Sequence, residues 1–262
     1  MGASGQQVTD PRLIRVPDDE QEWEPLLEVA AKVAAKGDLL VLPTDTVYGV
    51  GCDPFDRDAA DKLFAAKARG RDLPLPVLVH SRFQAEGLVR ELDERARSLI
   101  GAFWPGPLTL VLRESEGIGW YLGRNLGTVA LRMPKHTFAL ALLQRTGPLA
   151  VTSANRSGEP TPSTVVEIMT HLDEGVGVYF DAGPLPTPMP PSGGQEPTGP
   201  LPDPGTSSGG QGAGGSRGTG PSPASTIVDL TGPRARLLRE GAIPPREVER
   251  VLDEPLADPG SK

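Results

Sequence analysis

A chain of 262 residues, of which 37% are hydrophobic, is long enough for one sizeable domain with appendages or for two small ones. The formal net charge of −8 argues against a protein that coats nucleic acid, because such proteins present a basic face. The single cysteine excludes an internal disulfide, the scattered histidines do not have zinc-site spacing, and no apolar run approaches the roughly 18 residues of a membrane span. The N-terminus shows no secretory leader, so we expect a cytoplasmic protein with no metal site of its own and no membrane contact.

Helical and extended patterns alternate along the chain. Apolar residues at helical spacing predict helices, and short apolar runs predict strands. In chain order the expected elements are a helix over 21–36, a strand over 38–43, a helix over 57–68, a strand over 76–79, a helix over 91–103, strands over 108–112 and 128–132, a helix over 135–145, a strand over 149–152, a helix from about residue 164 and a strand over 178–180. This alternation indicates an α/β or mixed α+β domain, in which helices pack on a sheet.

A segment rich in glycine and proline interrupts the pattern. Residues 183–223 hold 12 glycines and 11 prolines in 41 positions, with no aromatic residue. Such a stretch buries too little apolar surface to offset its ordering entropy, so we predict a flexible insertion over 186–222; a lid or a partner-binding tract is the alternative. A strand over 225–230 and a helix over 245–252 follow it. The predicted division is therefore a lead-in over 1–15, one domain over 16–252 around the insertion, and a tail over 253–262.

Four segments carry candidate chemistry, although the common nucleotide-binding signatures are missing. Residues 42–51 run from a strand into a hydroxyl-rich turn ended by two glycines, which suits either a ligand crevice or an ordinary loop. Lys67 and Arg69 end a predicted helix, where cations cap carbonyl groups or clamp phosphates. Arg132 ends an apolar strand, and a buried guanidinium needs an anionic partner from the protein or from a ligand. Residues 152–160 place more hydroxyl and amide groups after a strand than one helix cap requires.

Seven motifs occur in an order that resembles the Sua5/YciO/YrdC family. They are Pro43-Thr44-Asp45-Thr46-Val47-Tyr48-Gly49, Lys67-x-Arg69, Phe103-Trp104-Pro105-Gly106-Pro107-Leu108-Thr109, Val129-Ala130-Leu131-Arg132-Met133-Pro134, Ser153-Ala154-Asn155-x-Ser157-Gly158, Ser225-Thr226-Ile227-Val228-Asp229 and Leu238-Arg239-x-Gly241. The match covers about residues 20–252, apart from the insertion. The resemblance implies one catalytic domain with an open, twisted mixed sheet, helices packed on it and a concave ligand face.

The resemblance also implies a nucleotidyltransferase that uses L-threonine, bicarbonate and ATP. Its products would be threonylcarbamoyl-AMP and pyrophosphate, and a separate complex would transfer the threonylcarbamoyl group to adenosine 37 of tRNA. A carbamate oxygen attacks the α-phosphate in this reaction, so no enzyme nucleophile is required and the protein has to position anions that repel one another. Mg²⁺ is expected to accompany the ATP.

Individual site residues follow from their positions in the motifs. The residues that would hold L-threonine are Thr44, Arg132 and Ser153. Arg132 would pair with the substrate carboxylate in the bidentate geometry that arginine favours. Lys67 and Arg69 would face bicarbonate and the phosphates as catalytic residues. The residues that would contact ATP are Arg69, Thr128, Asn155, Ser163 and Arg239.

This chain departs from the family pattern near the implied site. Leu73 and Leu78 stand where many members carry a polar residue, near ATP and near L-threonine respectively. His80 follows Leu78 by two residues, but strand positions two apart differ in depth, so we do not expect His80 to replace the polar group. Longer members have an extra C-terminal domain, which we do not expect here because only a short helix and a tail follow Arg239.

Two other functions stay open. A sister protein could share the fold and have a different activity, as in the carbamoyl-transfer domains of hydrogenase maturation proteins. A module that binds double-stranded RNA by shape is the second alternative, and weak contact with tRNA belongs with it. The net charge of −8 argues against RNA binding as the main activity.

Overall fold

The computed structural model of the protein describes residues 10, 12–124, 127–172, 174–185 and 224–257. The insertion predicted over 186–222 lies outside these residues, and its flexibility stays a prediction.

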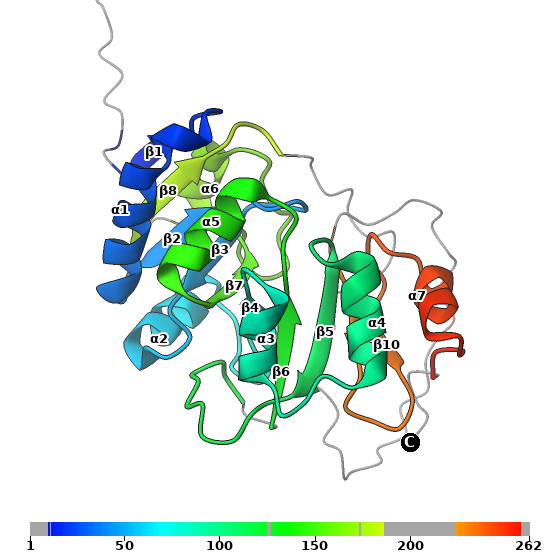
Figure 1. Ribbon diagram of the computed structural model, residues 1–262. Coiled ribbons are helices and arrows are strands. Elements are labelled where there is room, and N and C mark those ends of the chain that lie inside the picture. The colour runs from blue at the N-terminus through cyan, green and yellow to red at the C-terminus, as the bar shows by residue number, and fades with distance from the viewer. Residues whose placement is uncertain (1–9, 11, 125–126, 173, 186–223, 258–262) are drawn as a thin grey trace, which may run out of the picture.

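Within the described residues one mixed sheet contains ten strands (Figure 1). The strands are β1 (Leu13–Arg15), β2 (Leu39–Leu42), β3 (Gly49–Cys52), β4 (Val77–Leu78), β5 (Leu108–Arg113), β6 (Thr128–Arg132), β7 (Leu149–Ser153), β8 (Val176–Asp181), β9 (Thr226–Asp229) and β10 (Arg236–Arg239). The predicted mixed α/β fold is confirmed, whereas its concave ligand face stays a prediction.

The strand order is β1-β8-β2-β3-β7-β4-β6-β5-β9-β10. The pairs β1/β8, β2/β8, β4/β6 and β5/β9 are parallel, and the remaining pairs are antiparallel. Since β9 pairs with β5, the segment after the Gly/Pro-rich stretch returns to the same sheet, as expected for an insertion inside one domain. Residues 13–15 also belong to the sheet, so the predicted lead-in over 1–15 is wrong for these three residues: pairing with β8 makes them part of the domain.

The helices are α1 (Glu24–Ala35), α2 (Arg57–Ala66), α3 (Arg82–Leu88), α4 (Glu94–Phe103), α5 (Thr137–Thr146), α6 (Val165–His171) and α7 (Pro245–Leu252), with a 3₁₀ turn over Glu20–Glu22 before α1. Side-chain caps determine several starting points. Asp56 caps α2, Asp93 caps α4, and Thr164 forms a reciprocal capping box with Glu167 at α6. The cap at Asp93 explains why α4 begins three residues later than predicted. None of the described helices is long and apolar enough to cross a membrane.

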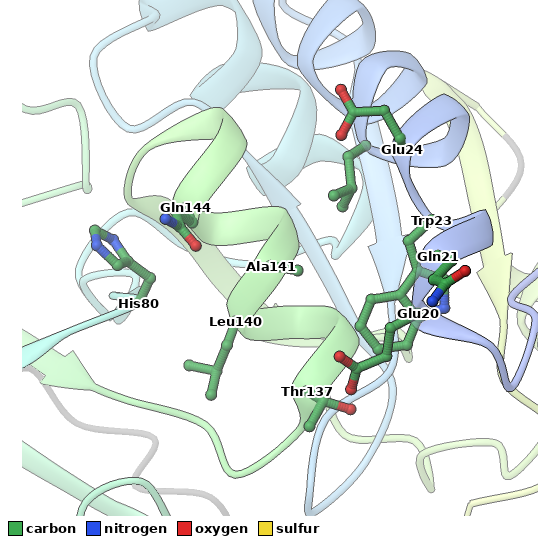
Figure 2. Close-up of a pocket in the computed structure, with 10 residues that line it drawn as sticks. Glu20, Gln21, Trp23, Glu24, His80, Thr137, Leu140, Ala141 and Gln144 are labelled. Atoms are coloured by element: carbon green, nitrogen blue, oxygen red, sulfur yellow. The ribbon is translucent and has the colours of Figure 1, made fainter.

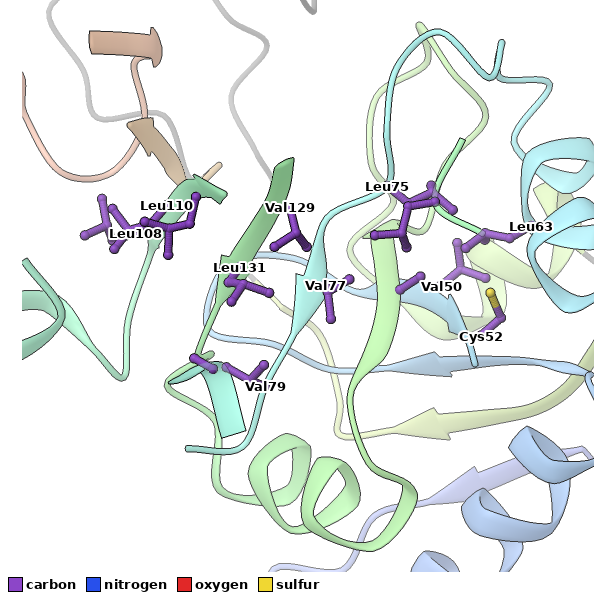
Figure 3. Close-up of a cluster of buried hydrophobic side chains, with 14 of the residues drawn as sticks. Val50, Cys52, Leu63, Leu75, Val77, Val79, Leu108, Leu110, Val129 and Leu131 are labelled. Atoms are coloured by element: carbon purple, nitrogen blue, oxygen red, sulfur yellow. The ribbon is translucent and has the colours of Figure 1, made fainter. Parts of the chain in front are cut away.

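Alternate residues of the strands pack into two clusters of buried side chains. Leu40 and Leu42 join the cluster under α1 and α5, two helices that lie side by side in Figure 1. Leu39 and Val41 join the larger cluster, which includes residues of α2, α3, α4, α6 and α7. Figure 3 shows part of the larger cluster, from Leu108 and Leu110 of β5 across the sheet to Leu63 of α2. Burial on both faces explains why these strands are continuous apolar runs in the sequence.

Strand β3 was not predicted, because Gly49 and Gly51 look like the end of a turn. Both glycines lie in the sheet, where Gly49 pairs with Ser153 and Gly51 pairs with Val151. A Cβ atom on Gly49 would lie 2.5 Å from Cγ1 of Val151, and one on Gly51 would lie 2.8 Å from Cγ2 of the same side chain. The glycines therefore leave room for Val151 between β3 and β7.

Gly49→Ala is expected to destabilise the protein by about 1–3 kcal/mol, because the added methyl group overpacks the contact with Val151. Urea unfolding measures this difference. Adding Val151→Ala should recover part of the loss, so that the double variant is less destabilised than the sum of the two single variants. Gly101→Ala in α4 is the control: a Cβ there meets nothing within 4 Å, so it should stabilise the helix by about 0.5–1 kcal/mol. Additive effects at positions 49 and 151 would contradict the packing explanation.

Candidate functional site

Arg132, the last residue of β6, is a buried cation with an anionic partner. Its Nη2 lies 2.5 Å from Oδ1 of Asp45, its Nη1 donates to Oγ1 of Thr46 at 3.1 Å, and its Nε donates to the carbonyl oxygen of Gly106 at 3.1 Å. Burial lowers the pKa of Arg132, and the charge of Asp45 opposes that effect. The expectation that this arginine needs an anion is confirmed, and Asp45 is the partner that the protein itself supplies.

Thr44 shapes the loop that carries Asp45. Its Oγ1 donates to the carbonyl oxygen of Val47 at 2.6 Å and accepts from the amides of Thr46 and Val47, both at 3.2 Å. It also lies 3.0 Å from Oγ1 of Thr46, the hydroxyl that accepts from Arg132. Thr44 therefore belongs to the same hydrogen-bond network as Arg132. Its hydroxyl proton is donated within the loop, to Val47.

Lys67, at the C-terminal end of α2, is only 2% exposed. Its ammonium group donates to the carbonyl oxygen of Ser153 at 2.6 Å, to Oδ1 of Asn155 at 3.1 Å and to the carbonyl oxygen of Asn155. Asn155 is itself buried, and its Nδ2 donates to the carbonyl oxygens of Arg156 and Glu159. The structure thus brings the predicted residues Lys67, Ser153 and Asn155 together, with the lysine holding the loop that follows β7.

The two groups are joined through Tyr48. Its carbonyl oxygen accepts from the amide of Ala154, and the next residue, Gly49, pairs with Ser153 in the sheet. The hydroxyl of Tyr48 donates to the carbonyl oxygen of Gly183 at 2.7 Å. Burial raises the pKa of Tyr48 to about 12, so the hydroxyl stays protonated near neutral pH and serves the structure as a donor.

A third group lies beyond Gly106. The hydroxyl of Thr109 lies 2.8 Å from Oγ of Ser225, and Arg239 donates to both the carbonyl oxygen and Oγ of Ser225. Since Arg132 donates to Gly106 and the amide of Thr226 donates to Pro107, segment 106–109 links the buried arginine to Arg239. Polar contacts therefore connect motifs that are more than 100 residues apart in the sequence.

Three predicted site residues are not joined to this network by a contact that the described structure specifies. The Nε of Arg69 donates to the carbonyl oxygen of Leu73, and Thr128 pairs with Arg113 at the start of β6. Ser163, two residues before α6, donates to Glu167 in the first turn of that helix. Their roles toward ATP stay predictions.

No role was predicted for Asp45, Thr46 or Ser225, although all three lie inside the motifs. The residues around them give no local sign of a partner, because Arg132 lies 87 residues from Asp45 and 86 from Thr46, and Thr109 lies 116 residues from Ser225. Leu78, where the resemblance led us to expect a polar residue in many members, is 4% exposed and packs in the cluster under α1 and α5. In this chain the position thus belongs to the core. The ring of His80 forms a hydrogen bond with the side-chain oxygen of Gln84 in α3.

A shallow pocket lies between α5 and the start of α1. Figure 2 shows residues that line it: Leu140, Ala141 and Gln144 come from α5, and Trp23 and Glu24 come from the start of α1. No predicted site residue lines this pocket. Its carboxylates would repel phosphate and bicarbonate, so we do not place the site there.

Strand ends and loops of one mixed sheet thus supply a connected set of cations, hydroxyls and amides, which defines an α/β protein with a candidate site for a ligand that carries anionic groups. Comparisons with known proteins agree. The family model described as "Telomere recombination", for Sua5, YciO and YrdC, matches residues 32–192. The chain belongs to the Sua5/YciO/YrdC family, and the predicted resemblance is confirmed.

Individual relatives cover most of the chain. A Mycobacterium tuberculosis protein that carries the provisional name threonylcarbamoyl-AMP synthase is 41% identical over 235 residues, which is 90% of this chain and 92% of the relative. A Pyrococcus abyssi threonylcarbamoyl-AMP synthase is 34% identical over 243 residues, 92% of this chain and 61% of the relative. The crystal structure of P. abyssi Sua5 with L-threonine matches with a TM-score of 0.69 and 32% identity, over 93% of this chain and 61% of that one. Escherichia coli YciO, at 22% identity and a TM-score of 0.66, shows the fold alone.

Proposed function

We propose that this protein is an enzyme that forms threonylcarbamoyl-AMP and pyrophosphate from L-threonine, bicarbonate and ATP. The observation that carries the proposal is the connected network around Arg132, in which motifs known from the family meet although they are far apart in the sequence. The names of the relatives, and the L-threonine complex of P. abyssi Sua5, support the same reaction. The chain spans 61% of the P. abyssi protein, so the activity of that longer protein is carried over here as a proposal.

In this proposal the protein positions reactants and supplies no nucleophile. Arg132 binds the carboxylate of L-threonine, and Lys67 keeps Ser153 and Asn155 in place beside it while contributing positive charge for bicarbonate and the phosphates. Arg69, Thr128, Asn155, Ser163 and Arg239 contact ATP. Holding the carbamate oxygen against the α-phosphate supplies roughly 7–11 kcal/mol of barrier reduction when the geometry is good.

Mg²⁺ would enter with the nucleotide. Among the described residues there is no group of three or more histidine, cysteine, aspartate or glutamate side chains arranged to hold a metal. In this proposal the ion is held chiefly by phosphate oxygens and water, which is how magnesium usually binds with nucleotides. Its contribution would be to neutralise charge on the triphosphate and on the leaving pyrophosphate. The cytoplasmic location and transfer to tRNA by a separate complex are parts of the same proposal.

Pyrophosphate release by the purified protein tests the proposal. The assay contains ATP, bicarbonate and Mg²⁺, with and without L-threonine. Release that depends on both L-threonine and bicarbonate is the expected result. Folded protein that releases no pyrophosphate would instead favour a sister protein of different activity, and salt-dependent RNA binding without ATP turnover would favour the RNA-binding module.

Ser225→Ala is expected to raise the KM for ATP about fivefold, because Arg239 loses one hydrogen bond worth roughly 1 kcal/mol and its guanidinium is less well placed. The KM for L-threonine should change much less. Steady-state kinetics with each substrate varied in turn separates the two effects. Thr231→Ala is the matched control, since that hydroxyl bonds to Asp229 at the other end of β9. A rise in both KM values would place Ser225 in the general support of the fold.

A further inference from the structure

Asp45 and Arg132 form an ion pair that has not used all of its hydrogen-bonding groups. The side chain of Asp45 is 12% exposed and that of Arg132 is 9% exposed. Oδ1 of Asp45 accepts from Arg132, whereas Oδ2 has no hydrogen-bond partner among the described residues and is not buried. One carboxylate oxygen can therefore accept a further hydrogen bond.

Arg132 has donors left as well. A guanidinium group carries five N–H donors, one on Nε and two on each terminal nitrogen. In the described structure Nε donates to Gly106, one N–H of Nη1 donates to Thr46 and one of Nη2 donates to Asp45. The two donors that remain, one on each terminal nitrogen, suit a carboxylate that binds with both oxygens. Among the described residues the ion pair thus keeps two unused N–H donors on Arg132 and one unused acceptor on Asp45.

The other ionisable groups nearby do not compete for Oδ2 of Asp45. His136, which precedes α5, is close enough for its charge to interact with that of Asp45, but burial lowers its pKa, so the ring is neutral near pH 7. Nδ1 of His136 is the acceptor that caps α5. The ammonium group of Lys67 donates to Ser153 and Asn155. No cationic side chain of the described residues therefore donates to Oδ2 of Asp45.

We propose that Asp45 and Arg132 act together as a receptor for the two ends of a zwitterionic α-amino acid. The carboxylate binds the remaining N–H donors of Arg132, and the amine donates to Oδ2 of Asp45. In an α-amino acid one carbon atom separates these two groups, so a cation and an anion in direct contact match them. The inference rests on the proposed function and deepens it, because Asp45 becomes a substrate-binding residue that selects for a free amine.

Calorimetric titration of the full chain tests this with two ligands. L-threonine has the amine, and (R)-3-hydroxybutanoate has the same carboxylate and hydroxyl without it. The wild-type protein should bind L-threonine at least about tenfold more tightly, as expected for a charge-assisted hydrogen bond. Asp45→Asn should lower the affinity for L-threonine by at least about tenfold. The affinity for (R)-3-hydroxybutanoate should stay the same or rise, because Asn retains the oxygen that accepts from Arg132. Asp61→Asn, at an exposed ion pair with Arg71, is the matched control and should change neither affinity.

Each outcome decides between different possibilities. If folded Asp45→Asn weakens both ligands equally, Asp45 only supports Arg132 and the inference is wrong. If the variant does not fold, as judged by its thermal midpoint, equal affinity of the wild-type protein for both ligands would still overturn the inference. If the wild-type protein releases pyrophosphate in a threonine-dependent way but binds both ligands equally well, the inference is wrong and the proposed function stands. A wild-type protein that neither binds L-threonine nor releases pyrophosphate overturns the proposed function as well.

Discussion

Arg132→Ala is expected to raise the KM for L-threonine about a hundredfold or more, and to change the KM for ATP far less. The two donors that Arg132 does not use among the described residues would both bind the substrate carboxylate, and charge-assisted hydrogen bonds are roughly twice as strong as neutral ones. Steady-state pyrophosphate release, with each substrate varied at saturating levels of the other, gives the two constants. Equal effects on both would contradict the assignment of Arg132 to L-threonine.

The same substitution should also weaken the fold. It leaves Asp45 without its partner in a largely buried position, and breaking such a pair costs about 3 kcal/mol or more. The double variant Arg132→Ala with Asp45→Ala removes both charges and should be more stable than the single variant in urea. It should still bind L-threonine poorly, which separates loss of the ligand contact from loss of stability. Arg145→Ala is the control, because its ion pair with Glu24 is exposed and worth little.

Lys67→Met is expected to lower the free energy of unfolding by about 3 kcal/mol or more and to reduce activity about a hundredfold. Methionine keeps most of the apolar stem but donates to none of the oxygens of Ser153 and Asn155, which are then left unsatisfied in a buried place. The loop after β7 should lose its position, and with it the contacts proposed for both substrates. Urea unfolding and pyrophosphate release measure the two effects.

Lys62→Met provides a matched comparison in the same helix. Its ammonium group donates to Gly37 and Asp38, but the side chain is 40% exposed, so water can replace the lost contacts and the cost should stay below about 1 kcal/mol. If both variants were equally stable, Lys67 would not hold the loop. A stable but inactive Lys67→Met variant would point instead to the predicted direct role of the ammonium group at bicarbonate and the phosphates.

Local signals in the sequence were enough for most elements. The capping box of Thr164 and Glu167 marks the start of α6, and apolar spacing identifies α1 and α5. The short helix α3 was missed because seven residues contain too few turns to show a period. Strand β3 was missed because its glycines carry no apolar pattern, and its extended form follows from pairing with β2 and β7 on either side.

The candidate site also has features that the sequence predicts and features that only the structure reveals. The sequence alone determined the fold class, the family and which residue types gather in motifs, because these depend on local pattern and order along the chain. Only the tertiary structure decided that Asp45 is the anion facing Arg132, that Lys67 is buried against Ser153 and Asn155, and that Leu78 belongs to the core. The reason is that each of these partnerships depends on which strands become neighbours, and strand order results from packing both faces of the sheet at once rather than from any short stretch of residues.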